Sequence, residues 1–474
     1  MTVIYSARWL LPIASPMIED GALAIDGSTI VAVGPRGEIV SAFPNSPIED
    51  FGQAAIIPGL INVHSHLELT VLRGFLEPEE SDFFAWLRKL TIARLAMTPE
   101  DLIVSATCGA IEAAHSGVTS VGDSSSSGAQ VMPALRRVGL RGVVYQESFG
   151  PDPQRAAENV AQLCDQIGGM REYENDLVRV GVSPHAPYTV SATQLEMISR
   201  LAIDEKLPLM MHAAESQAEK LLLLEGRGAF AEGFKKRAID WKAPRISTIA
   251  YLKRHGVLET KPLLAHCINV DDTDLDLIKH SSAAIAHCPK SNAKLGHGHA
   301  PFAQFISQGI TVGLGSDSVA SNNNCDILAE ARFATLLARF NWDGSPRVSK
   351  GAESVGLGEG IGARPNVRAN APVTAEQALL AATLDGARAL GIDDRVGALA
   401  KGMQADIVVV DLSGAHQQPI GNPAATLVFS SSGRDVLLTM VAGRDIFRDG
   451  RMNTASEEEL RIRLTELRSK LEGT

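Results

Sequence analysis

Residues 54–66, AAIIPGLINVHSH, form an apolar run that ends in two histidines separated by one residue. Residues i and i+2 of a β-strand point to the same face, so His64 and His66 face the same way if this stretch is extended. Two imidazoles at the end of a buried strand are well placed to share a metal ion. An isolated pair of this kind can equally be two polar residues facing water, so its meaning depends on the rest of the chain.

Short apolar runs that end in reactive residues recur along the middle of the chain, mostly separated by stretches with helical spacing. One such stretch has Thr98 as a predicted N-cap, Pro99 at the first helical position and Gly117 beyond its end. Eight strands are predicted in all: AAIIPGLINVHSH (54–66), VTSVGDSS (118–125), LRGVVYQESFG (140–150), LVRVGVSPHAPYT (177–189), LPLMMHAAES (207–216), PLLAHCINV (262–270), AAIAHCPKSN (283–292) and ITVGLGSDS (310–318).

Eight alternating strands and helices over this length predict an α/β fold with a TIM (β/α)8 barrel, which we expect in residues 57–395. The near-continuous apolar runs suit parallel strands that are buried on both faces. Residues 1–56 and 396–474 differ, because they contain short strands broken by turns, such as ADIVVVDL at 405–412. We therefore expect the two chain ends to build one small β-sandwich, followed by a C-terminal helix.

Length and composition limit the functional classes. The chain has 474 residues, 45% of them hydrophobic, which suits one large domain and a smaller one. Its formal net charge of −11 argues against a nucleic-acid or anionic-membrane partner, so we expect a small-molecule substrate. The start of the sequence lacks the pattern of a signal peptide, and no apolar run reaches the roughly 18 residues of a membrane span. Five scattered cysteines do not indicate a disulfide framework, so we expect a cytoplasmic protein.

A barrel would bring the reactive strand ends onto one face. The residues at these ends are His64, His66, His185, His212, Glu215, His266, His287 and Asp317. Three imidazoles and one carboxylate from this set suit a single divalent ion, Zn²⁺ or the similar Fe²⁺, with one position left for water. The predicted ligands are His64, His66, His212 and Asp317. Such an ion would lower the pKa of bound water to about 7.

Several motifs together resemble the amidohydrolase superfamily. They are PGLINVHSH, HAAES, LLAHC, HCPKSN, LGSDSVASNNNCDILAEAR and the closing LAKGMQADIVVVD, and the resemblance spans nearly the whole chain. It points to the branch that contains s-triazine hydrolases, guanine and cytosine deaminases, and methylthioadenosine/S-adenosylhomocysteine deaminases. The resemblance implies that the four predicted ligands hold one metal ion. Binuclear members need a carboxylated lysine or a glutamate on the fourth strand, and the present strand has neither.

The resemblance also implies a reaction. The protein is expected to be a metal-dependent hydrolase that removes ammonia from an aminated purine-type ring. Glu215 would transfer protons to the ring nitrogen and the leaving ammonia, while His266 and Asp317 would orient the attacking water and accept its proton. Alternatives within the family are hydrolysis of another C–N or C–Cl bond, as in free-base deaminases, triazine hydrolases and cyclic amidases. A catalytically inactive scaffold is a more distant alternative.

Five residues are predicted to contact substrate. SPHAPYT resembles the PHSPY stretch of adenosine-derivative deaminases, which implies that His185 contacts the base, with packing under the loop as the alternative. Glu68 and Arg73 are candidates for a ribose or carboxylate contact, or for a loop salt bridge. Gln146 and Glu147 are further candidates at the end of the third strand. HSHLELTVLRG, FFAWLRKL and YQESFG resemble aminodeoxyfutalosine deaminases, which act on an adenine-bearing nucleoside.

Other features remain open at this stage. Residues 341–372 are rich in Gly, Ser and charge and are expected to form a long surface loop, with a lid or an oligomer contact as alternatives. His297 and His299 are interpreted as polar loop residues near the mouth of the site, with a substrate contact or a second metal site as alternatives. Cys267 and Cys288 follow strand-end histidines and should point to the opposite face, as buried packing residues. A homo-oligomer is compatible with the sequence but is not indicated by any motif.

Overall fold

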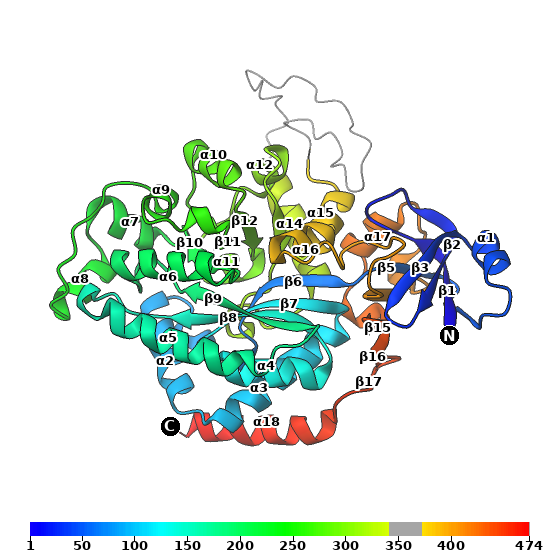
Figure 1. The fold of residues 1–474 in the computed structure, drawn as a ribbon, viewed down its shortest axis with the longest axis horizontal. Helices are drawn as coiled ribbons and strands as arrows, with labels where there is room; N and C mark the ends of the chain where they lie inside the picture. Colours follow the sequence, from blue (N-terminus) through cyan, green and yellow to red (C-terminus); the bar gives the residue numbers. More distant parts are fainter. Residues whose placement is uncertain (341–371, 474) are drawn as a thin grey trace.

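The computed structural model describes residues 1–340 and 372–473 (Figure 1). All eight predicted strands are present, and they form two parallel four-stranded sheets. The first sheet has the order β6 (Leu60–Ser65), β7 (Val118–Ser125), β8 (Arg141–Ser148) and β9 (Val178–Pro184). The second has the order β10 (Met210–Ala213), β11 (Leu263–His266), β12 (Ala284–His287) and β13 (Val312–Leu314).

Two isolated parallel bridges connect the edges of these sheets. One pairs Val182 of β9 with Leu209, directly before β10, and the other pairs Ser65 of β6 with Asp317, shortly after β13. The strands are buried almost along their whole length, as expected for parallel sheets that are covered by other elements. The carboxyl ends of the eight strands therefore lie where one group of side chains can meet.

Helices follow most of these strands. Helix α3 begins with a capping box in which Thr98 and Asp101 each accept the other's backbone N–H, as the sequence indicates for its start. The helices between β6 and the end of this region are α2 (Phe83–Leu95), α3 (Pro99–His115), α4 (Gly128–Val138), α5 (Ala156–Arg171), α6 (Ala192–Asp204), α7 (Gln217–Glu225), α8 (Ala229–Lys236), α9 (Thr248–Arg254), α10 (Asp272–Ser281), α11 (Pro289–Lys294), α12 (Phe302–Ser307), α13 (Val319–Asn322), α14 (Ile327–Phe340), α15 (Ala375–Ala382) and α16 (Leu384–Leu390).

Both chain ends contribute to one nine-stranded sheet, at the right of Figure 1. Its order is β17-β16-β15-β14-β5-β1-β2-β3, and β4 pairs with β1. The strands are β1 (Thr2–Leu10), β2 (Ile18–Asp26), β3 (Thr29–Pro35), β4 (Ile48–Asp50), β5 (Ala54–Pro58), β14 (Ile407–Asp411), β15 (Val436–Val441), β16 (Arg444–Arg448) and β17 (Arg451–Met452). Short helices α1 (Arg36–Ala42) and α17 (Pro423–Phe429) accompany it.

The stretch 54–66 contains two strands in place of the single strand expected. Strand β5 pairs with β1 and β14 in the terminal sheet, whereas β6 starts the first parallel sheet. The chain changes sheets at Gly59, where a Cβ atom would lie 2.0 Å from Thr119 Oγ1. Glycine suits this crossing, because a β-carbon here would overlap the side chain of Thr119.

A buried ion pair joins the first parallel sheet to the terminal sheet. Arg141 at the start of β8 is 3% exposed, and Asp406 directly before β14 is 2% exposed. The Arg141 Nε donates to one carboxylate oxygen at 3.0 Å and its terminal nitrogen to the other at 3.1 Å. Asp406 also accepts the backbone N–H of Ala442 at 2.7 Å. Each buried charge is therefore matched by a partner in another part of the fold.

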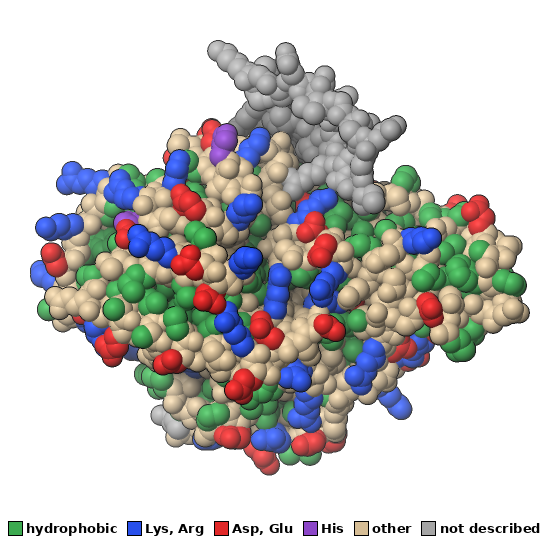
Figure 2. Space-filling view, in the orientation of Figure 1, with side chains coloured by type: hydrophobic (Ala, Val, Ile, Leu, Met, Phe, Trp, Pro, Cys, Tyr) green, Lys and Arg blue, Asp and Glu red, His purple; other side chains and the backbone are tan. Residues whose placement is uncertain are grey.

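The C-terminal helix α18 (Glu457–Glu472) packs along α3 of its own chain, at the bottom of Figure 1. Leu460, Leu467 and Leu471 are buried in this contact. No helix among the described residues is long and apolar enough to cross a membrane. Figure 2 shows acidic and basic side chains interspersed on the face in view. The loop expected at 341–372 lies, except for its last residue, outside the described residues.

Candidate metal centre and active site

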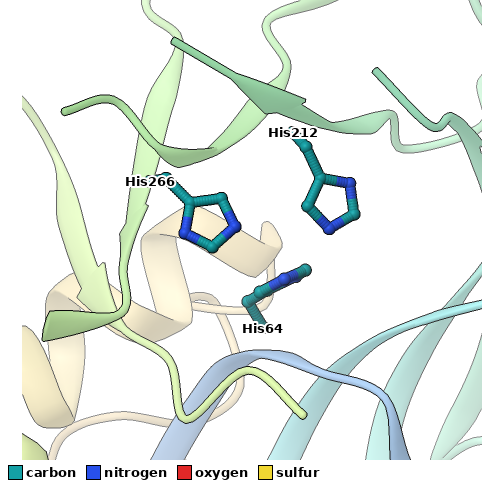
Figure 3. Close-up of side chains that lie close together, drawn as sticks. All are labelled: His64, His212 and His266. Carbon is teal, nitrogen blue, oxygen red and sulfur yellow. The ribbon is translucent and has the colours of Figure 1, made fainter. Parts of the chain in front are cut away.

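Four histidines from three strand ends converge on one point. His64 is the penultimate residue of β6 and His66 directly follows that strand, His212 lies in β10, and His266 ends β11. The ring centroid of His64 lies 4.9 Å from those of His66 and His212 and 5.5 Å from that of His266. Figure 3 shows His64, His212 and His266 pointing toward one another. The structure thus brings together residues that are up to about 200 positions apart in the chain.

Asp317 completes the cluster from the end of β13. Its Oδ1 lies 3.4 Å from the Nε2 atoms of both His64 and His66. Its Oδ2 accepts hydrogen bonds from the hydroxyls of Ser291 at 2.5 Å and Ser321 at 3.0 Å. Burial raises the pKa of Asp317, but the neighbouring histidines outweigh it and hold the pKa well below its usual range. Asp317 is therefore an anion with one oxygen fixed and the other turned to the histidines.

These side chains fit a divalent metal ion. The Nε2 of His64 is buried without a hydrogen-bond partner among the described residues. The opposite ring nitrogens are held by the fold: His64 Nδ1 lies 3.2 Å from Met210 Sδ, and His212 Nδ1 lies 3.0 Å from the carbonyl of His185. Burial lowers the pKa of His66 to about 3 and that of His212 well below its usual value, so both rings are neutral, which is the form that binds metals.

Glu215 stands beside this cluster. It follows β10, and its backbone N–H donates to the buried carboxylate of Glu219 at 2.9 Å. Its Oε1 lies 3.6 Å from Nε2 of His266, and its Oε2 accepts a hydrogen bond from the Tyr188 hydroxyl at 3.3 Å. The other ring nitrogen of His266 lies 2.8 Å from Asn292 Oδ1, which fixes the ring. Glu215 and His266 are therefore oriented as a pair.

A cavity of about 450 Å³ opens in front of these residues. One wall is apolar and comes mainly from α2, with Phe83, Trp86, Leu87 and Leu90. Phe230 of α8 adds to it and stacks on Tyr188 with ring centroids 4.1 Å apart. The polar part of the lining includes His66, His212, His266, Glu215 and Asp317. A cavity of this size, with an apolar wall and few polar groups, suits a small organic molecule.

Three of the five predicted substrate contacts line this cavity: His185, Glu68 and Glu147. Glu68 is 1% exposed, and its Oε1 accepts the Ser125 hydroxyl at 2.7 Å. Glu68 Oε2 and Glu147 Oε1 are buried without a hydrogen-bond partner among the described residues. Burial, together with the charge of Glu68, raises the pKa of Glu147 to about 8. Both carboxyl groups can still accept hydrogen bonds from a ligand.

The structure does not bring Arg73 and Gln146 to the cavity. The Arg73 guanidinium forms an ion pair with Glu112 of α3, which is the loop salt bridge left open by the sequence. The Gln146 amide accepts the backbone N–H of Gly128 at 3.2 Å and donates to two carbonyl groups. Strand alternation turns Gln146 to the face opposite to that of its neighbour Glu147. Its hydrogen bond to Gly128 fixes the start of α4.

Sequence reasoning missed several residues of the site. Trp86 and Arg94 line the cavity from α2, and their Nε1 and Nε atoms are buried without a hydrogen-bond partner in the described part of the chain. The signal was the stretch 83–95, whose helical character places every third or fourth residue on one face. His297, predicted as a loop residue near the mouth, packs edge-on against Phe83, with ring centroids 4.6 Å apart.

The strand-end residues outside the site have packing roles. Cys267 and Cys288 are fully buried, as expected from strand alternation. His287 is also buried and stacks on Phe302 with ring centroids 5.0 Å apart. It does not line the cavity.

Comparison with known proteins identifies the family. The sequence pattern of the Amidohydrolase family matches residues 55–446. A shorter match, to the imidazolonepropionase-like composite domain of bacteria, covers residues 21–45. The chain belongs to the amidohydrolase family, and it is therefore a hydrolase.

Particular relatives are similar over nearly the whole chain. A 5-methylthioadenosine/S-adenosylhomocysteine deaminase of Nitratidesulfovibrio vulgaris is 31% identical, over 95% of this chain and 93% of the relative. The corresponding deaminase of Moorella thermoacetica is 28% identical over 96% of both chains. An adenosine deaminase from Xanthomonas campestris with bound zinc has a TM-score of 0.80 at 24% identity, over 100% of this chain and 99% of that one. A zinc complex of atrazine chlorohydrolase from Arthrobacter aurescens has a TM-score of 0.81 at 22% identity, and the match covers 98% of this chain and 100% of that one.

Proposed function

We propose that the protein is a metal-dependent deaminase that hydrolyses the amino group of an adenine-type nucleoside and releases ammonia. The observation that carries this proposal is the position of Glu215, which stands 3.6 Å from His266 at the edge of the histidine cluster and lines the cavity. A carboxyl group there can exchange protons with a ring held in front of the cluster. The relatives named as deaminases of adenosine derivatives support the same choice.

The proposed metal site uses His64, His66, His212 and Asp317 to hold one ion. Zinc is the proposed metal, because this set of nitrogen and carboxylate donors suits it and two structural relatives contain it. When bound, such an ion would lower the pKa of a water molecule to about 7 and so supply a nucleophile near neutral pH.

The protein groups carry the proton transfers. Asp317 and His266 orient the attacking water and take up its proton. Glu215 protonates the ring nitrogen next to the carbon under attack, which makes that carbon more electrophilic. The bond from this carbon to the amino nitrogen then breaks as Glu215 delivers a proton to the leaving group. One proton of the water passes through Glu215 to the ring nitrogen, and the other passes from Asp317 and His266 through Glu215 to ammonia, while the oxygen of the water replaces the amino group.

The polar end of the cavity favours a nucleoside over a free base. Glu68 Oε2 and Glu147 Oε1 are buried acceptors that find no donor among the described residues. Such groups cost free energy until a ligand satisfies them. Sugar hydroxyls are suitable donors, whereas a free base has none in that region. His185, which also lines the cavity, is the proposed contact to the base.

We further propose that β6 to β13 close into a barrel within residues 57–395, and that residues 1–56 and 396–474 build a β-sandwich beside it. The bridges at Val182 and Ser65, one at each edge of the two parallel sheets, support closure. The fold of the zinc-containing relatives supports the same architecture. A cytoplasmic location and a homo-oligomeric state stay predictions from the sequence.

An ammonia-release screen tests this function. Zinc-loaded protein would be assayed against adenosine, methylthioadenosine, S-adenosylhomocysteine, free bases and triazines. We expect turnover of the nucleosides, and we expect Glu215→Gln to lower kcat about 10²–10⁴-fold while the metal content stays unchanged. Turnover of free bases or triazines alone, or full activity of Glu215→Gln, would contradict the proposal.

A further inference from the structure

His297 lies in a loop that turns it inward. The loop, GHGHAP at 296–301, connects α11 to α12. His297 is flanked by Gly296 and Gly298, with φ angles of +68° and +106°, a backbone region that residues with a β-carbon rarely adopt. The backbone N–H of His297 donates to the carbonyl of Asn292 at 2.9 Å. The two glycines and this hydrogen bond fix the loop in a conformation that turns the His297 side chain toward Phe83 and Glu215.

The His297 ring reaches Glu215. Its side chain is 7% exposed, and its Nε2 lies 3.7 Å from Glu215 Oε1. The same oxygen lies 3.6 Å from Nε2 of His266. His297 Nε2 is buried and has no hydrogen-bond partner among the described residues. A buried polar atom of this kind is costly unless a partner comes within reach, and Glu215 is the nearest charged group.

Asn292 links the two histidines that face Glu215. Its side-chain oxygen lies 2.8 Å from His266 Nδ1, and its carbonyl accepts the backbone N–H of His297. One residue of α11 therefore sets the position of both rings. Tyr188 donates to the other carboxylate oxygen of Glu215, Oε2. Glu215 thus lies next to three polar groups, and His297 is the histidine among them with no assigned part in the reaction.

We propose that His297 is a positioning residue that donates a hydrogen bond from Nε2–H to Glu215 Oε1 when substrate is bound. The present separation is longer than a hydrogen bond, and such contacts often shorten when the substrate complex forms. Burial lowers the pKa of His297, so its ring is neutral near pH 7 and carries one N–H. With Oε1 held in this way and Oε2 accepting from Tyr188, the orientation of the carboxylate is fixed, and its remaining lone pairs can serve the substrate. The inference rests on the proposed function, because it gives Glu215 the proton-transfer role.

Kinetics of three variants test this proposal. His297→Leu keeps an apolar side chain against Phe83 but removes the donor, and should lower kcat about 10- to 100-fold with KM within about threefold. His297→Gln keeps an amide N–H donor at a similar distance, so its kcat should be lower than that of the wild type by no more than about 3- to 10-fold. His299→Asn is the matched control, because His299 is an exposed histidine of the same loop, and this variant should leave kcat unchanged. Wild-type kcat in His297→Leu would overturn the proposal.

A measurement independent of turnover separates this proposal from the proposed function. Protein labelled with ¹⁵N at its 12 histidines would give ring-nitrogen spectra, with His297 assigned by the loss of its signals in His297→Gln. With the deaminated product, a hypoxanthine nucleoside, bound, we expect a protonated Nε2 whose signal moves in Glu215→Gln. An unchanged His297 signal would overturn the positioning role even if His297→Leu is inactive. If the wild type releases no ammonia from any nucleoside, the proposed function fails, and the same spectra recorded without ligand still decide whether His297 senses Glu215.

Discussion

Removal of the sugar from the substrate tests the polar end of the cavity. Glu68 and Glu147 each offer one buried carboxylate oxygen without a hydrogen-bond partner among the described residues. A hydrogen bond from a hydroxyl contributes about 1.5–3 kcal/mol with a charged acceptor and about 0.5–1.5 kcal/mol with a neutral one. Glu147, with a pKa of about 8, is largely neutral near pH 7, so the loss of one bond of each kind costs about 2–4.5 kcal/mol. We therefore expect kcat/KM for adenine to be about 30- to 2,000-fold lower than for adenosine.

The assay is ammonia release at low substrate concentration, which reports kcat/KM directly. Glu68→Gln replaces one charged acceptor by a neutral amide of the same size. It should lower kcat/KM about 10- to 100-fold for adenosine and leave the value for adenine unchanged, because adenine does not reach this residue. Equal kcat/KM values for adenine and adenosine in the wild type would refute the reasoning. So would an equal loss on both substrates in Glu68→Gln, since that would indicate a general disturbance of the site.

Two further predictions concern stability and the support of the metal ligands. Arg141→Met should lower the free energy of unfolding by about 3–5 kcal/mol in a denaturant titration, because Asp406 is left charged and buried. The exposed pair Arg155–Glu158 provides the control, and an equal effect of Arg155→Met would contradict this account. Ser291→Ala removes the 2.5 Å hydrogen bond to Asp317 Oδ2 and should weaken zinc binding about 10- to 100-fold in competition with a chelator. Unchanged zinc affinity would show that Ser321 alone holds the carboxylate.

The parts of the site that lie at strand ends could be predicted from the sequence. His64, His66, His212 and Asp317 each follow an apolar run, and parallel strands bring such positions to one face. The same reasoning does not decide between adjacent residues near the end of one strand. Gln146 and Glu147 end the same strand, but only Glu147 lines the cavity, and the exact end of a strand is not visible in its composition.

Contacts outside the strand ends depend on tertiary packing. Arg73 finds its partner Glu112 from another element, 39 residues further along the chain, and no local pattern marks that pair. Trp86 and Arg94 belong to α2, which is apolar enough on several sides to obscure which face lines the cavity. The crossing at Gly59 splits one apolar run between two sheets, because a close approach of Thr119 excludes any side chain there. Such features follow from distant neighbours and require coordinates.

The central claim is that side chains distant in the chain form one binding site for a catalytic metal ion. Metal analysis by mass spectrometry on zinc-loaded, desalted protein tests it most directly. We expect one zinc ion per chain in the wild type and in Glu215→Gln, and less than a tenth of that in His212→Asn and Asp317→Asn. A wild type without bound metal, or ligand variants that keep a full equivalent of zinc, would contradict the account.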